Sequence, residues 1–86
     1  MATKQFKIGE YAIGGIIKVD VRSTLVTIKA LDYYSKNVVL EKTFNNDESA
    51  YWNMDDFLNE LTSSYYAEKV LEYIAQNSNV SKQLFR

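Results

Sequence analysis

Two short runs of alternating residues constrain this chain most. In residues 16–21 (Ile-Ile-Lys-Val-Asp-Val) every second side chain is apolar, and residues 25–31 (Leu-Val-Thr-Ile-Lys-Ala-Leu) repeat the pattern. Successive side chains of a β-strand point to opposite faces, so the alternation predicts two strands that each bury one face. Residues 22–24 form a short polar segment between the two strands, which is typical of a hairpin connection.

The alternation also selects the register of this hairpin, because a slip by one residue exchanges the two faces. A loop of two or four residues sets Val21 opposite Val26 and Ile17 opposite Ala30, so that apolar side chains share a face. A three-residue loop would set Ile17 opposite Lys29. We therefore expect the first register.

A third strand follows the hairpin. Residues 33–37 contain the turn, and Asn37 tolerates the left-handed backbone conformation that a three-residue loop requires. Residues 38–44 return beside the second strand, which completes a three-stranded meander. The side chains expected to face the core are Val38, Leu40 and Phe44.

A fourth strand is the favoured reading of the first fifteen residues. Phe6 and Ile8 alternate with Lys7, which predicts a strand before Gly9. The pair Gly14-Gly15 is either a hairpin turn, which adds this strand to the sheet, or a bulge within one long bent strand. We favour the turn.

Helices are expected in the second half. A polar loop over residues 45–49 precedes Asn53, which suits the N-cap of a helix. From there two apolar stripes at helical spacing would lie on opposite sides of one continuous helix. A break at residues 62–64 resolves this, so we expect helices over 54–62 and 64–77 rather than one long helix whose second stripe meets another subunit. The first stripe is Met54, Phe57, Leu58, Leu61 and Tyr65, and the second is Ala67, Val70, Leu71 and Ile74.

These elements predict an α+β fold, with an antiparallel meander of three or four strands covered on one face by two C-terminal helices. The expected organisation is one domain over residues 1–77, with a strand half at 4–44 and a helical half at 53–77. Residues 78–86 are expected to form a polar tail with a frayed end rather than a docking peptide.

The residue types argue against an enzyme. Without His or Cys, the chain lacks the commonest acid/base and metal-binding side chains. Residues 9–15 have the glycine spacing of a phosphate-binding loop, but residues 16–17 are both Ile where Lys and Ser or Thr are needed. The adjacent acids at 47–48 and 55–56 point apart on a helix and are interpreted as solvated acids at helix starts. We expect no catalytic residue, no cofactor and no metal.

Charge is unevenly distributed along the chain. Residues 1–44 carry seven basic and four acidic side chains, a net charge of +3, whereas residues 45–77 carry one basic and seven acidic side chains, a net charge of −6. In the chosen register Lys18 lies opposite Lys29 on the face away from the core, with Glu41 on the next strand to relieve the like charges. A basic sheet under an acidic helical layer is therefore expected.

The same outer face also carries apolar side chains, which is unusual for a face left in water. Three kinds of cover are compatible with it: the N-terminal segment containing Phe6 and Ile8, a second copy, or a different protein. We expect a protein-interaction or regulatory module that binds itself or a host protein through this face. The expected contacts are Leu25, Leu31, Tyr33 and Val39, with Lys18 and Lys29 setting orientation.

Two alternative functions use the same features. Single-strand nucleic-acid binding would combine Lys18 and Lys29 with stacking by Tyr11 and Tyr33, but the net charge of −1 and the acidic helices oppose it. Mimicry of nucleic acid by the acidic helices is the second alternative.

The expected setting is the cytoplasm, because the chain begins without a signal peptide and has no apolar run long enough to span a bilayer. From its size and its start we also expect a complete small gene product, of the sort common in phages and mobile elements.

Overall fold

The alternating first half forms a four-stranded antiparallel sheet. A computed structural model of the chain describes residues 2–8 and 15–77. The strands occur in the sheet in chain order, as a meander. Their bounds are β1 (Ala2–Lys7), β2 (Ile16–Val21), β3 (Leu25–Leu31) and β4 (Val38–Asn45).

The β2–β3 register is the one predicted from alternation. Val21 pairs with Val26 and Ile17 with Ala30, and Lys18 lies opposite Lys29. The N–H of Arg22 donates to the carbonyl of Leu25 over 2.8 Å, which closes the hairpin around a two-residue turn. A single buried face was therefore sufficient to select this pairing.

The favoured fourth strand is present, because β1 pairs with β2 in antiparallel register. The N–H of Ile8 donates to the carbonyl of Gly15 over 2.7 Å, so Gly15 continues the ladder. Gly14, the other half of the expected turn, lies outside the described residues. Phe6 and Ile8 do not cover the outer face, which was one of the three alternatives, since both side chains pack with the core on the helical side.

Two details of the β3–β4 connection differ from the prediction. Lys36 rather than Asn37 adopts the left-handed backbone, with a φ of 64°. A bulge interrupts the pairing, so Ala30 pairs with Leu40 but Leu31 pairs with Val38. Val38 therefore lies beside Leu31 instead of facing the core, because one extra residue on a strand reverses the alternation beyond it.

Two helices follow, α1 (Tyr51–Leu61) and α2 (Ser64–Gln76), with a short 3-10 turn (Glu48–Ala50) before them. The predicted break is thus confirmed. The predicted start is wrong: Ala50 is the N-cap, so Asn53 lies inside the first turn of α1 and the acids at 55–56 lie beyond that turn. Asp47 instead accepts hydrogen bonds from the Ala50 N–H and the Ser49 hydroxyl, at 3.1 and 2.7 Å.

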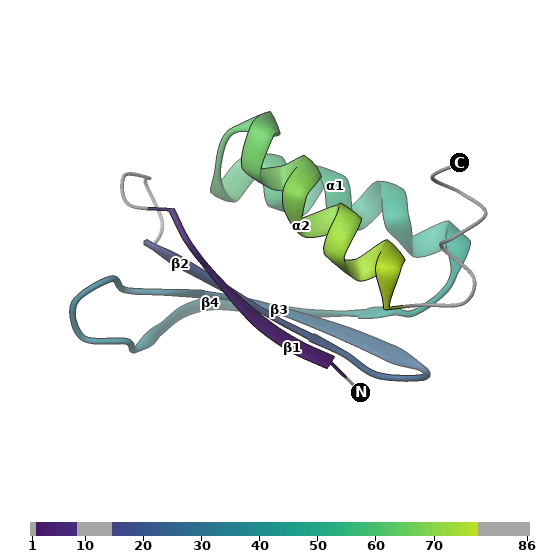
Figure 1. Cartoon of the computed structure of the whole chain (residues 1–86), viewed down its shortest axis with the longest axis horizontal. Coiled ribbons are helices and arrows are strands. Elements are labelled where there is room, and N and C mark those ends of the chain that lie inside the picture. Colours follow the sequence, from purple (N-terminus) through teal and green to yellow (C-terminus); the bar gives the residue numbers. More distant parts are fainter. Residues whose placement is uncertain (1, 9–14, 78–86) are drawn as a thin grey trace.

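Both helices lie on one face of the sheet and run in opposite directions (Figure 1). Their buried side chains meet those of the central strands, and Met54, Leu58 and Ile74 are fully buried. The predicted stripes match this core except for Tyr65, which is exposed. The sheet therefore has an inner face under the helices and an outer face opposite them.

Candidate functional site

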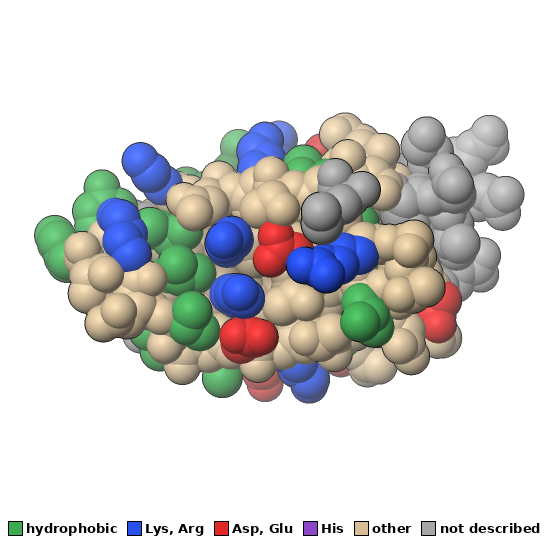
Figure 2. Space-filling view, turned by 90° about the horizontal axis from the view of Figure 1, so that it is seen from below, with side chains coloured by type: hydrophobic (Ala, Val, Ile, Leu, Met, Phe, Trp, Pro, Cys, Tyr) green, Lys and Arg blue, Asp and Glu red, His purple; other side chains and the backbone are tan. Residues whose placement is uncertain are grey.

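The outer face is apolar at one end and polar in its middle (Figure 2). Hydrophobic side chains gather at the left end of this view, where Figure 1 has the β3–β4 loop. Lys or Arg and Asp or Glu side chains cross the centre of this view, and the strand register aligns two rows of polar residues on this face. These rows are Gln5, Lys18, Lys29 and Glu41, and Thr3, Asp20, Thr27 and Thr43.

The polar rows satisfy one another in part. The Thr3 hydroxyl donates to Asp20 over 2.6 Å, and the hydroxyls of Thr27 and Thr43 are 3.3 Å apart. Lys29 pairs with Glu41 as well as with Lys18 in the register, as expected from the sequence. The central outer face is thus suited to water, and the apolar side chains at one end need a separate explanation.

The largest exposed apolar cluster is at the β3–β4 end. We call it the hairpin-end patch, and its members are Tyr33, Tyr34, Val38, Val39 and Leu40. They are five of the eight large hydrophobic side chains that are exposed in the described residues. Tyr34 is 88% exposed and Val39 is 52% exposed, and the rings of Tyr33 and Tyr34 meet edge to face at 5.2 Å. Clusters of this kind mark interaction sites more often than scattered exposed residues do.

The patch is held by an ordered turn. The carboxylate of Asp32 accepts the N–H groups of Tyr34 and Ser35 at 3.0 and 2.8 Å, and the hydrogen bond from the Ser35 backbone is the main cause of a lowered Asp32 pKa. The Lys36 ammonium donates to the Tyr33 carbonyl over 2.6 Å and lies 5.0 Å from the centroid of the Tyr33 ring. The two tyrosines are therefore presented by a loop with few free backbone groups.

Among the strands of the described residues, β4 lies at the edge of the sheet and pairs only with β3. Leu40 is paired with Ala30, a residue of the inner face, whereas Val38 is paired with Leu31 on the outer side. Exposed apolar side chains therefore lie on both sides of this strand. Such an edge presents backbone donors and acceptors to an additional strand.

The predicted contact residues do not form one surface. Tyr33 and Val39 belong to the hairpin-end patch, Lys18 and Lys29 occupy the polar middle, and Leu25 is 41% exposed near the opposite end. Leu31 is only 8% exposed; it pairs with buried Ile16 and so offers little surface to a partner.

Tyr34, Val38 and Leu40 are exposed members of the patch that the sequence did not indicate as contacts. The alternation assigned Val38 and Leu40 to the core, and the consecutive apolar residues 38–40 were the available signal that one strand exposes both faces.

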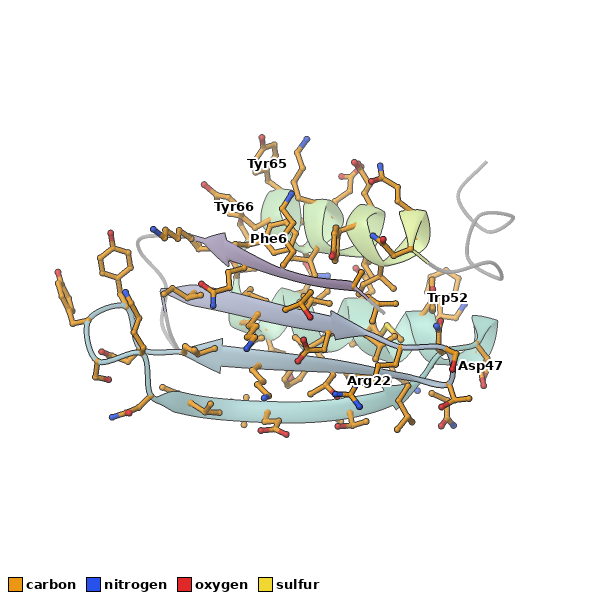
Figure 3. All side chains as sticks on the ribbon, turned by 60° about the horizontal axis from the view of Figure 1, so that its bottom comes forward. Phe6, Arg22, Asp47, Trp52, Tyr65 and Tyr66 are labelled. Carbon is orange, nitrogen blue, oxygen red and sulfur yellow. The ribbon has the colours of Figure 1, made fainter. Side chains whose placement is uncertain are left out.

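A second surface lies between the helices. Here α1 and α2 enclose a groove of about 480 Å³, which we call the inter-helix groove. Its lining residues are Tyr51, Trp52, Asp55 and Asn59 of α1 and Ser64, Glu68 and Leu71 of α2. Trp52 is 75% exposed and projects on the helical side of the sheet (Figure 3).

Within residues 2–8 and 15–77, no three metal-binding side chains gather in one place. In the same part of the chain, neither helix has the length and apolar character needed to cross a membrane. Comparison of the chain with protein-family models, with curated proteins and with solved structures found no match.

Proposed function

We propose that this protein is a non-enzymatic interaction module that binds another protein chain at the hairpin-end patch and the adjoining edge of β4. The observation that carries the proposal is the concentration of exposed apolar side chains in residues 33–40. Tyr34 is the most exposed member of the patch, at 88%, and tyrosine is common among residues that dominate binding energy at interfaces.

The unpaired edge of β4 favours an extended partner segment. An added strand would form backbone hydrogen bonds with β4, and its alternating side chains would cover Val38 on one side and Leu40 on the other. The partner strand comes from a second copy of the chain or from a different protein. Backbone hydrogen bonds can form with almost any partner sequence. The side chains of the hairpin-end patch would therefore determine which partner is bound.

Lys18 and Lys29 have an orienting role in this proposal. They lie two residues from Ile16 and Leu31 on the same face of β2 and β3, about 7 Å along the strands. Charges at the rim of an interface influence association rate and orientation more than affinity. An anionic group on the partner beside the patch would therefore be favoured.

Light scattering after size exclusion, over a wide concentration range, tests self-association. If the partner is a second copy, the chain should form a dimer that Val39→Glu disrupts, because this change places a carboxylate within the apolar contact. Tyr65→Ser is the matched control, since Tyr65 is an exposed aromatic residue on α2, away from the patch. Equal dissociation by both variants would contradict the proposal.

If the chain is monomeric at all concentrations, the partner is a different protein. Capture of a specific partner by the wild-type chain and by Tyr65→Ser, but not by Val39→Glu, then supports the proposal. Salt-sensitive binding of single-stranded oligonucleotides that is lost in Lys18→Glu and Lys29→Glu would overturn it in favour of nucleic-acid recognition.

A further inference from the structure

We propose that the inter-helix groove is a docking site for a cationic amphipathic helix of a partner protein. This surface shares no residue with the hairpin-end patch and lies on the helical layer, so this proposal does not depend on the function proposed above. Its shape, its apolar floor and its charge each restrict what it can hold.

The floor and one wall of the groove are apolar. Tyr51 and Leu71 line it with largely buried side chains, whereas Trp52 beside them is 75% exposed. A tryptophan left in water next to an apolar floor can bury most of its surface once another side chain enters the groove. Tryptophan is also among the residue types that most often dominate the energy of protein interfaces.

The charged side chains that line the groove in the described part of the chain are both acidic: Asp55 contributes a carboxylate from α1 and Glu68 one from α2. Lys69, the only basic residue of the two helices, lies with its ammonium 5.4 Å from the Tyr65 ring centroid. These carboxylates favour a ligand that brings positive charge and repel a nucleic-acid backbone or an anionic membrane surface.

The length of the groove fits about two turns of a helix. Its lining spans residues 51–59 of α1 and 64–71 of α2, which corresponds to about 10–12 Å along each helix axis. An apposed helix would place apolar residues at positions i, i+3 or i+4, and i+7 onto this floor, with Lys or Arg on either side of the stripe. The acidic groups at 55 and 68 lie on opposite helices, so cations on both flanks would be neutralised.

Because Trp52 is the single tryptophan of the sequence, its fluorescence reports directly on the groove. The probe is a synthetic amphipathic peptide of about 15 residues, with Leu at every third or fourth position and Lys on both flanks. Titration into the full chain should shift the Trp52 emission to shorter wavelength, with an affinity that falls as salt increases. A peptide with Glu in place of Lys should produce no shift.

Charge variants separate docking in the groove from general attraction to an acidic protein. The double variant Asp55→Asn/Glu68→Gln should weaken peptide binding by about tenfold or more. The matched control Asp56→Asn/Glu60→Gln removes the same charge from side chains outside the groove lining and should weaken binding much less. Equal losses in the two variants would overturn the proposal.

Two other occupants would also overturn it. If light scattering shows a dimer that Trp52→Ala separates, a second copy of the chain fills the groove. If Leu84→Ser/Phe85→Ser in the full chain moves the Trp52 emission to longer wavelength without added peptide, residues 78–86 are the occupant. Unchanged circular dichroism and thermal midpoint in each variant establish that the fold is intact.

Discussion

The backbone of Gly15 lies so close to Tyr33 that a Cβ added at Gly15 would sit 2.6 Å from the Cβ of Tyr33. The Tyr33 Cβ is anchored directly to its backbone, so it cannot rotate away as the end of a flexible side chain would. The Gly15 N–H also donates to the Leu31 carbonyl over 3.0 Å, which fixes the two segments against each other. The start of β2 and the β3–β4 loop are thus joined by a close backbone approach that only glycine permits.

Gly15→Ala should therefore destabilise the fold by about 1–3 kcal/mol, as other forced insertions into packed regions do. Without the steric conflict the same change would stabilise by about 0.4–1 kcal/mol, because alanine restricts the unfolded chain. Urea denaturation distinguishes the two signs. In a Tyr33→Gly background the penalty should largely disappear, and a penalty of unchanged size would show that Tyr33 is not its cause.

Leu31 and Val39 lie close together in the chain but should respond differently to truncation. Leu31 is 8% exposed and pairs with buried Ile16, so Leu31→Ala should cost about 2–4 kcal/mol of unfolding free energy. Val39 is 52% exposed, so Val39→Ala should change stability by less than about 0.5 kcal/mol. If Leu31→Ala and Val39→Ala lose similar amounts of unfolding free energy, Val39 belongs to the core and not to the hairpin-end patch.

The sheet was predictable because period-two alternation allows only one register that buries apolar side chains on a single face. Alternation alone places Val21 opposite Val26 and Lys18 opposite Lys29, and both pairs are present in the sheet. The bulge at Val38 was not predictable, since residues 38–40 are all apolar and alternation cannot show which of them faces the core. The bulge explains why the exposed Val38 was assigned to the core, whereas Leu40 lies on the predicted inner side, opposite Ala30, and is 40% exposed there.

The start of the first helix was misplaced for a different reason. Asn53 has a good capping side chain, but Asp47 holds the preceding 3-10 turn, and no side chain caps α1. Tyr51 precedes Met54 and Leu58 by three and seven residues, so the apolar stripe itself extends one turn earlier. Stripe continuity was the better signal here. The inter-helix groove, by contrast, depends on how two helices pack together, which the periodicity of either one does not determine.

Asp32 should make a pH-dependent contribution to stability. Its pKa in the folded chain is lowered from the ordinary value of 3.8, chiefly by the backbone N–H of Ser35. A group with a lowered folded pKa stabilises above its unfolded pKa, and this contribution is lost as pH falls through the folded pKa. The contribution should therefore be complete above about pH 5 and decline on acidification below pH 3.8.

Asp32→Asn tests this dependence, because the amide oxygen still accepts the two backbone N–H groups but carries no charge. Wild type should be more stable than the variant at neutral pH, and the difference should shrink as the carboxylate is protonated. Thermal midpoints measured from pH 7 to pH 2 provide the comparison. A difference that stays constant over this range would mean that the ionised carboxylate does not hold the turn.

Thr62 combines a buried hydroxyl with a backbone conformation that valine also favours. It ends α1 with an extended backbone, φ −153° and ψ −175°, and its side chain is 7% exposed. Its Oγ1 has no hydrogen-bond partner among the described residues, and leaving such a group buried costs about 1–3 kcal/mol. Thr62→Val replaces the hydroxyl with a methyl group of similar shape and should stabilise the fold by about 1 kcal/mol in urea denaturation. Thr27→Val is the matched control, because the Thr27 hydroxyl lies 3.3 Å from the Thr43 hydroxyl on the outer face and its loss should not stabilise the fold. A destabilised Thr62→Val would contradict the prediction, since it would show that the Thr62 hydroxyl is hydrogen-bonded in solution.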